Sequence, residues 1–114
     1  MILDDGILKI YKVISQKTPM GKPKKVLKYY DEAWYGINNT SITEYYNAKQ
    51  ADVNIEMRIE ILQNKGVKTN DIIILDDIQY TVGRVYHGVD EDDIPITDIT
   101  LEKVVNNYEF EGIL

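Results

Sequence analysis

The 114-residue sequence contains no cysteine and a single histidine, His87. Without cysteine it can form no disulfide, no thiolate nucleophile and no cysteine-based zinc site. One histidine cannot supply a metal site that uses two or three imidazole ligands of one chain. The two serines, Ser15 and Ser41, do not lie in the strained turn that exposes a serine nucleophile. The sequence therefore predicts no catalytic residue, no metal site and no cofactor, and hence a protein that is not an enzyme.

Long apolar runs are also missing. The longest uninterrupted aliphatic run is residues 72–75, whereas a membrane-spanning helix needs about 20 apolar residues. Residues 1–6 are acidic, whereas a secretory signal begins with basic residues and continues with apolar ones. We therefore expect an intracellular protein that has no membrane partner.

Phosphate-binding and calcium-binding patterns are absent as well. The seven glycines are scattered singly, so no glycine-rich phosphate loop is formed. Residues 90–93 are four consecutive carboxylates, but they lack the alternating ligands, central glycine and distal glutamate of a calcium loop. We interpret residues 88–95 as a solvated acidic loop. The adjacent Asp76 and Asp77 are typical of a tight hairpin turn.

Charge is unevenly distributed along the chain. The formal net charge is −6, with +1 in residues 1–57 and −7 in residues 58–114. An acidic chain is a poor general DNA binder, because phosphate neutralisation needs clustered cations. Such a cluster occurs around residues 15–25, where Pro19, Gly21 and Pro23 predict an exposed loop. The loop is either simply solvated or contacts DNA or an acidic partner through Lys17, Lys22, Lys24 and Lys25.

Alternating apolar residues predict a β protein. The alternation is clearest in residues 53–62, where apolar positions from Val53 to Ile61 alternate with mostly polar ones. The expected strands are residues 7–14, 26–37, 53–62, 72–75, 78–86 with a kink at Gly83, and 96 or 97 to 105. This pattern predicts a mainly β fold: one domain of residues 1–114, built as a small antiparallel β-barrel or sandwich of five or six strands. Residues 105–114 are expected to form a C-terminal tail.

One short helix is expected between these strands. Ser41 and Glu44 have the spacing of a capping box, which marks a helix N-terminus. Ile42, Tyr45, Tyr46 and Lys49 then fit one or two helical turns that must dock on the sheet, since such a helix is too short to be stable alone. An extended segment is the alternative.

The aromatic residues are nine tyrosines, one tryptophan and one phenylalanine. Tyrosine and tryptophan suit half-buried sheet faces and interfaces, because each has an apolar body and a polar tip. Trp34 and Tyr80 are therefore candidates for core residues or for anchors of a subunit interface.

The order of the motifs resembles a known family. An aromatic-rich strand ends in Ala33-Trp34-Tyr35-Gly36 and is followed by Thr43-Glu44-Tyr45-Tyr46 and Ala48, a strand with Arg58, and Asp71-Ile72-Ile73. A hairpin with Asp77, Tyr80, Val82 and Val85 and a final strand with Ile99 and Leu101 complete the order. Over residues 26–105 the sequence is similar to the head–tail adaptor, or head-closure, proteins of tailed bacteriophages and prophages. The acidic loop 88–95 departs from the family pattern.

The resemblance implies a structural protein that assembles as a ring beneath the portal protein, joins the capsid to neighbouring connector or tail-completion proteins, and helps to retain the packaged double-stranded DNA. It implies location at the head–tail junction of the virion, and in the host cytoplasm during assembly. It also implies that the segment 38–52 lines the channel or contacts a neighbouring subunit. The residues concerned are Asn38, Thr40, Glu44, Tyr45, Tyr46 and Lys49.

Two alternatives remain. The first is a tail-completion or tail-terminator subunit, which also forms a ring. The second is an oligonucleotide-binding barrel, in which Tyr29, Tyr30 and Trp34 stack bases beside the lysine cluster. The acidic net charge argues against the second.

Overall fold

The computed structural model describes residues 3–37, 56–104 and 106–111. These residues form a mainly β fold, which confirms the predicted fold class. No helix long and apolar enough to cross a membrane occurs among them. The seven strands of this described part are β1 (Gly6–Lys17), β2 (Pro23–Ile37), β3 (Glu56–Leu62), β4 (Ile72–Leu75), β5 (Ile78–Val89), β6 (Pro95–Lys103) and β7 (Glu109–Phe110).

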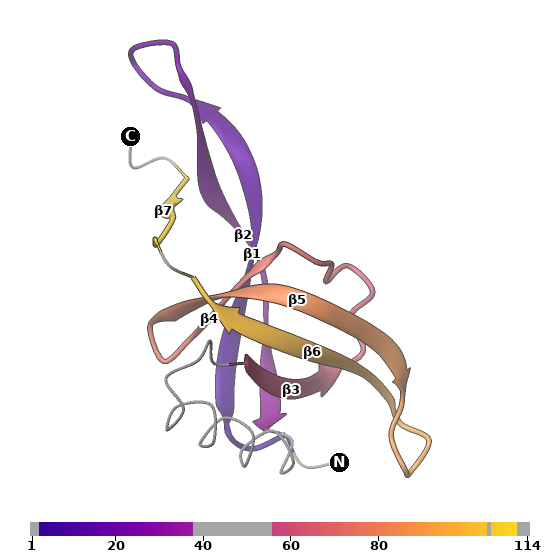
Figure 1. The fold of residues 1–114 in the computed structure, drawn as a ribbon. Coiled ribbons are helices and arrows are strands. Elements are labelled where there is room, and N and C mark those ends of the chain that lie inside the picture. The colour runs from indigo at the N-terminus through magenta and orange to yellow at the C-terminus, as the bar shows by residue number, and fades with distance from the viewer. Residues whose placement is uncertain (1–2, 38–55, 105, 112–114) are drawn as a thin grey trace.

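Six of the strands form one closed ring of backbone pairing. Their order is β1-β4-β5-β6-β3-β2, and β2 then pairs with β1 from Pro23 to Tyr35, along the whole of β1. All pairs within the ring are antiparallel. The short β7 pairs in parallel with β2, on the edge of β2 opposite to β1. Figure 1 shows β3, β5 and β6 curving around the lower part of the molecule, with β7 beside the upper part of β2.

The ring encloses the hydrophobic core. Alternate residues of each strand point inward, as the period of two predicted for residues 53–62 requires. Strand β6, which lies between β3 and β5, contributes Ile99 and Leu101, and both side chains are completely buried. The other core residues are Leu8, Ile10, Tyr35, Ile59, Ile61, Val67, Ile73, Leu75, Tyr80 and Val82.

The predicted hairpin of residues 72–75 and 78–82 is confirmed. Asp76 and Asp77 connect β4 to β5, and both have positive φ angles, 52° and 63°. Two central residues with positive φ form the turn type that matches the twist of a two-residue hairpin. Strand β5 continues past Gly83, where the pairing with β6 shifts by one residue between Val82 and Arg84. The kink expected at Gly83 is therefore a β-bulge.

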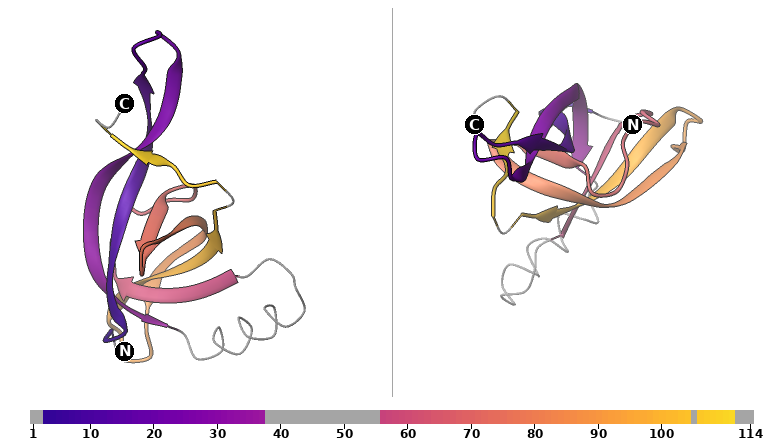
Figure 2. Two further views of the ribbon diagram at one scale, coloured as in Figure 1. Left: turned by 90° about the vertical axis from the view of Figure 1, so that its left-hand side faces the viewer. Right: turned by 90° about the horizontal axis from the view of Figure 1, so that it is seen from above.

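The prediction of a loop at residues 15–25 was wrong. β1 continues to Lys17 and β2 begins at Pro23, so only residues 18–22 form the turn. Pro23 is tolerated because it is the first residue of its strand. Since β1 pairs with β4 only from Lys9 to Tyr11, the hairpin beyond this point leaves the ring. We call residues 12–28 the arm; it projects from the ring in Figure 1 and in the left view of Figure 2.

The end of the described chain is held against the arm. The expected tail contains β7, whose Glu109 and Phe110 pair with Val26 and Leu27 of β2. Nearby, the Gln79 side chain exchanges two hydrogen bonds with the backbone of Tyr108, at 3.0 and 2.9 Å. The predicted short helix, and the candidate loop with Asn38, Thr40, Glu44, Tyr45, Tyr46 and Lys49, lie outside the described residues.

Candidate interaction site

Metal-ligating side chains and the single histidine are the first groups to consider in the part of the chain that the structure describes. Within residues 3–37, 56–104 and 106–111, no group of three or more histidine or carboxylate side chains could hold a metal ion. The Nδ1 atom of His87 is hydrogen-bonded to the Thr97 hydroxyl at 2.9 Å. That hydroxyl also accepts a hydrogen bond from the backbone N–H of Asn64, at 2.9 Å. His87 therefore helps to connect β5 and β6 to the segment that follows β3.

Trp34 and Tyr80 occupy opposite environments. Tyr80 is buried in the core, with 7% of its surface exposed. Trp34 lies on β2 with 57% of its surface exposed, so its placement in the core, one of the two alternatives, was wrong. An interface anchor remains the prediction for Trp34. Directly across the hairpin from Trp34 lies Ile7, which is 50% exposed.

Ile7 and Trp34 belong to an apolar row on the face of the β1–β2 hairpin that is turned away from the core. Directly opposed residues of an antiparallel pair lie on the same face. The next apolar pair in this row is Tyr11 and Tyr29, whose rings meet edge to face at a centroid distance of 5.7 Å. Phe110 of β7 packs on Tyr11 at 5.3 Å. We call this row of Ile7, Tyr11, Tyr29, Trp34 and Phe110 the outer aromatic face.

Trp34 also borders an apolar hollow. β2 pairs with β3 only at Gly36 and Ile37, so the two strands separate before they reach Trp34. The hollow of about 300 Å³ between them is lined mainly by apolar side chains, including Leu3, Ala33 and Leu62. An exposed tryptophan beside an apolar hollow has the character of an interface hot spot.

The four predicted contact lysines are placed on the arm, but not in one loop. Lys17 is on β1, Lys24 and Lys25 are on β2, and Lys22 is in the turn. Lys24 forms an ion pair with Glu109, at 2.7 Å between Nζ and Oε2, which ties β7 to the arm. The remaining three are exposed to solvent.

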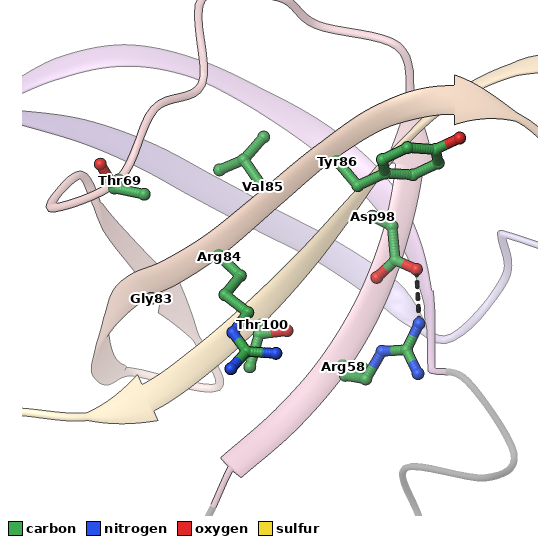
Figure 3. A pocket seen from close by; sticks show the side chains of 8 residues that line it. All are labelled: Arg58, Thr69, Gly83, Arg84, Val85, Tyr86, Asp98 and Thr100. Carbon is green, nitrogen blue, oxygen red and sulfur yellow. Dashed lines mark hydrogen bonds and ion pairs between the residues drawn. The ribbon is translucent and has the colours of Figure 1, made fainter.

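A second surface, which the sequence did not predict, gathers two arginines. An open hollow of about 730 Å³ is lined by Arg58 of β3, by Thr69 and by residues of β5 and β6. Figure 3 shows these side chains. Arg58 donates a hydrogen bond to Asp98, at 2.8 Å between Nη2 and Oδ2. Arg84 and Tyr86 come from β5, next to this pair. From the sequence, these residues could be assigned only to outward positions of their strands. That assignment does not show that the three strands are neighbours.

The acidic turn between β5 and β6 is shorter than predicted. β5 extends to Val89 and β6 begins at Pro95, so the expected loop of residues 88–95 is reduced to residues 90–94. The Asp90 carboxylate accepts hydrogen bonds from the backbone N–H groups of Ile94 and Asp92, each at 2.9 Å. These hydrogen bonds, with that of Ile94 the stronger influence, lower the pKa of Asp90.

Glu60, on β3, carries a charge that destabilises the fold. Burial and the nearby Asp98 carboxylate raise the pKa of Glu60. A carboxyl whose pKa is raised by folding is disfavoured in its ionised form, so it costs stability at neutral pH. This cost decreases as the pH falls through the folded pKa and disappears below the unfolded pKa. We expect Glu60→Gln to raise the urea midpoint of unfolding at pH 7. The gain should shrink as the pH falls through the folded pKa, which lies above the ordinary value of 4.5, and should be nearly gone below 4.5. A gain that is constant with pH would contradict this origin.

Comparison with known proteins gives the fold alone. No family model matches the chain, and no curated protein sequence matches it. Among solved structures, it is similar to the solution structure of protein SF1141 from Shigella flexneri 2a, with a TM-score of 0.59 and 14% sequence identity. The match covers 89% of this chain and 93% of the other. Similarity at this level of identity supports the mainly β fold and says nothing about function.

Proposed function

We propose that this chain is a structural subunit of the head–tail connector of a tailed bacteriophage or prophage. In this role it forms a ring with copies of itself, joins the portal protein to the next connector or tail component, and helps to retain packaged DNA. The proposal includes location at the head–tail junction and the absence of catalytic activity. It is supported by the motif order of residues 26–105 and by the surfaces described above.

The observation that carries the proposal is the exposed Trp34 beside Ile7. Tryptophan and tyrosine are enriched at protein interfaces, and a few such residues supply most of the binding free energy. Here the largest side chain of the protein is 57% exposed, across the hairpin from an aliphatic residue that is 50% exposed. A neighbouring subunit or the portal protein would cover both residues and the apolar hollow next to them.

The shape of the molecule agrees with such a role. The extents are 51 × 34 × 20 Å, and the arm accounts for one end of the long axis. A small ring of strands with a projecting hairpin offers separate surfaces for different neighbours. Subunits that form rings need such distinct, complementary surfaces, because each subunit contacts two neighbours differently.

Trp34→Ala tests the proposed interface. Because Trp34 is exposed, we expect the free energy of unfolding to change by less than about 1 kcal/mol. We expect binding to the portal ring, measured by surface plasmon resonance, to weaken by about 2 kcal/mol or more, which is roughly 30-fold. Tyr86→Ala is the matched control, because Tyr86 is 66% exposed but lies on β5, beside the arginines. Equal effects of the two substitutions would contradict a specific role for Trp34.

The second candidate function is binding of single-stranded nucleic acid. Tyr29 and Tyr30 are 52% and 41% exposed, close to Lys28 in sequence, and exposed aromatic rings can stack bases. Tyr30 is less suited than Tyr29, since the Lys12 ammonium group lies 4.7 Å from the centre of its ring. Tight binding to a single-stranded oligonucleotide that weakens steeply with salt would favour this candidate. A tail-completion subunit remains the alternative within the phage assembly class.

A further inference from the structure

The arm has a charge opposite to that of the rest of the protein. Residues 12–28 contain six lysines and no aspartate or glutamate. The other 97 residues contain the remaining seven of thirteen cations and all nineteen carboxylates, which gives them a formal charge of −12. The net charge of −6 therefore hides two regions of opposite sign.

Four of the arm lysines are available to a partner. Lys12 is paired with Asp71, and Lys24 is paired with Glu109. The other four are exposed, and no carboxylate among the described residues is within ion-pair distance of their ammonium groups. These four available lysines are Lys17, Lys22, Lys25 and Lys28.

Within one molecule, and among the described residues, only Lys12 and Lys24 of the arm form ion pairs with carboxylates of the body. The arm projects away from the ring, and the acidic turn of residues 90–93 lies at the opposite end of the molecule in Figures 1 and 2. Further contacts of the four available lysines with an acidic body are therefore expected between molecules. A contact in which the arm of one copy meets the body of the next is heterologous, the type that generates rings.

We propose that the exposed lysines of the arm dock on the acidic body of a second copy of this chain. Charge complementarity identifies the occupant: the body carries many carboxylates, which attract the lysines of a neighbour. The same body repels the phosphates of a nucleic acid, and four lysines give only a few phosphate contacts. The inference rests on the proposed function in that it names a surface through which the subunits of a connector ring meet.

The test replaces Lys17, Lys22 and Lys25 by glutamine, and measures self-association by sedimentation velocity. At about 0.01 M salt, where charges interact over about 30 Å, we expect the wild-type protein to associate, and to become monomeric at about 0.15 M salt. Each exposed charge pair contributes a factor of about 1.4 to 5, so the triple variant should associate roughly 3- to 125-fold more weakly. Mixed with wild type, it should still form dimers, because its body can accept a wild-type arm.

The control replaces Lys65, Lys68 and Lys103, three exposed lysines of the body, by glutamine, which changes the net charge equally. It should associate as well as wild type. The inference is overturned if the two triple variants behave alike, if wild type stays monomeric at 0.01 M salt, or if the arm binds a 20-base-pair DNA duplex without self-association. Portal binding at 0.15 M salt is scored separately. If the protein binds the portal but shows no arm-dependent self-association, this inference is wrong and the proposed function stands. If it self-associates through the arm but does not bind the portal, the proposed function is wrong and the arm contact stands.

Discussion

Ile99→Ala is expected to lower the free energy of unfolding by about 2–5 kcal/mol. Ile99 is completely buried at the middle of β6, where it lies between Ile59 of β3 and Val85 of β5. Truncation removes three carbon atoms from the centre of the ring and leaves a cavity that paired strands on both sides cannot close. The loss is measured by urea denaturation of the purified protein.

Two further variants make this expectation specific. Ile99→Val removes one carbon atom and should cost about 0.5–1.5 kcal/mol, which gives a measurable value even where the alanine variant does not fold. Leu62→Ala changes a residue of β3 that is 60% exposed and should cost less than about 1 kcal/mol. A cost at Leu62 equal to that at Ile99 would contradict a core enclosed by the ring.

Lys12→Met is expected to have the second largest effect, a loss of about 2–3 kcal/mol. This is less than the roughly 3–5 kcal/mol lost on breaking a fully buried ion pair, because 29% of the Lys12 side chain is exposed. The Lys12 ammonium group forms an ion pair with the Asp71 carboxylate, at 2.5 Å, and also donates a hydrogen bond to the backbone carbonyl of Gly66. Only 10% of the Asp71 side chain is exposed, so removing its partner leaves a nearly buried carboxylate without a cation. Methionine keeps the apolar part of the lysine side chain, which isolates the effect of the charge.

The matched control for Lys12 is Lys24, on the same hairpin. Its ion pair with Glu109 is open to solvent, with 41% and 50% of the two side chains exposed. Exposed ion pairs contribute about 0–1 kcal/mol, so Lys24→Met should change stability by less than about 1 kcal/mol. Urea denaturation of both variants compares the two losses of stability. A larger loss for Lys24→Met than for Lys12→Met would show that the burial of Asp71 does not determine the size of the effect.

The sequence predicted those strands that have one buried face. The alternation of Ile59 and Ile61 with polar residues reflects a strand that separates core from solvent, and the adjacent Asp76 and Asp77 reflect the backbone conformation of a tight turn. Only the outer part of the arm, strand residues 15–17 and 23–25, was missed, because residues there such as Lys17 and Lys25 face solvent and so show no alternation. Pro19 and Pro23 favoured a loop there, yet one lies in the turn and the other at a strand start.

The candidate surfaces were only partly predictable. The lysine cluster is local in sequence and could be recognised, although its hairpin structure could not. The exposure of Trp34 depends on which face of β2 turns toward the core, and a single aromatic residue does not reveal this. The hollow with Arg58 and Arg84 depends on the order of β3, β6 and β5 in the ring, which is a property of the tertiary fold.

The most direct test of the proposed connector function is the mass of the protein in solution, alone and mixed with the portal ring of the same phage, measured by light scattering at about 0.15 M salt. A monomer that joins a ring only when the portal protein is present is the predicted result. A monomer that ignores the portal protein and instead binds single-stranded DNA would contradict the connector function and favour the nucleic-acid-binding alternative.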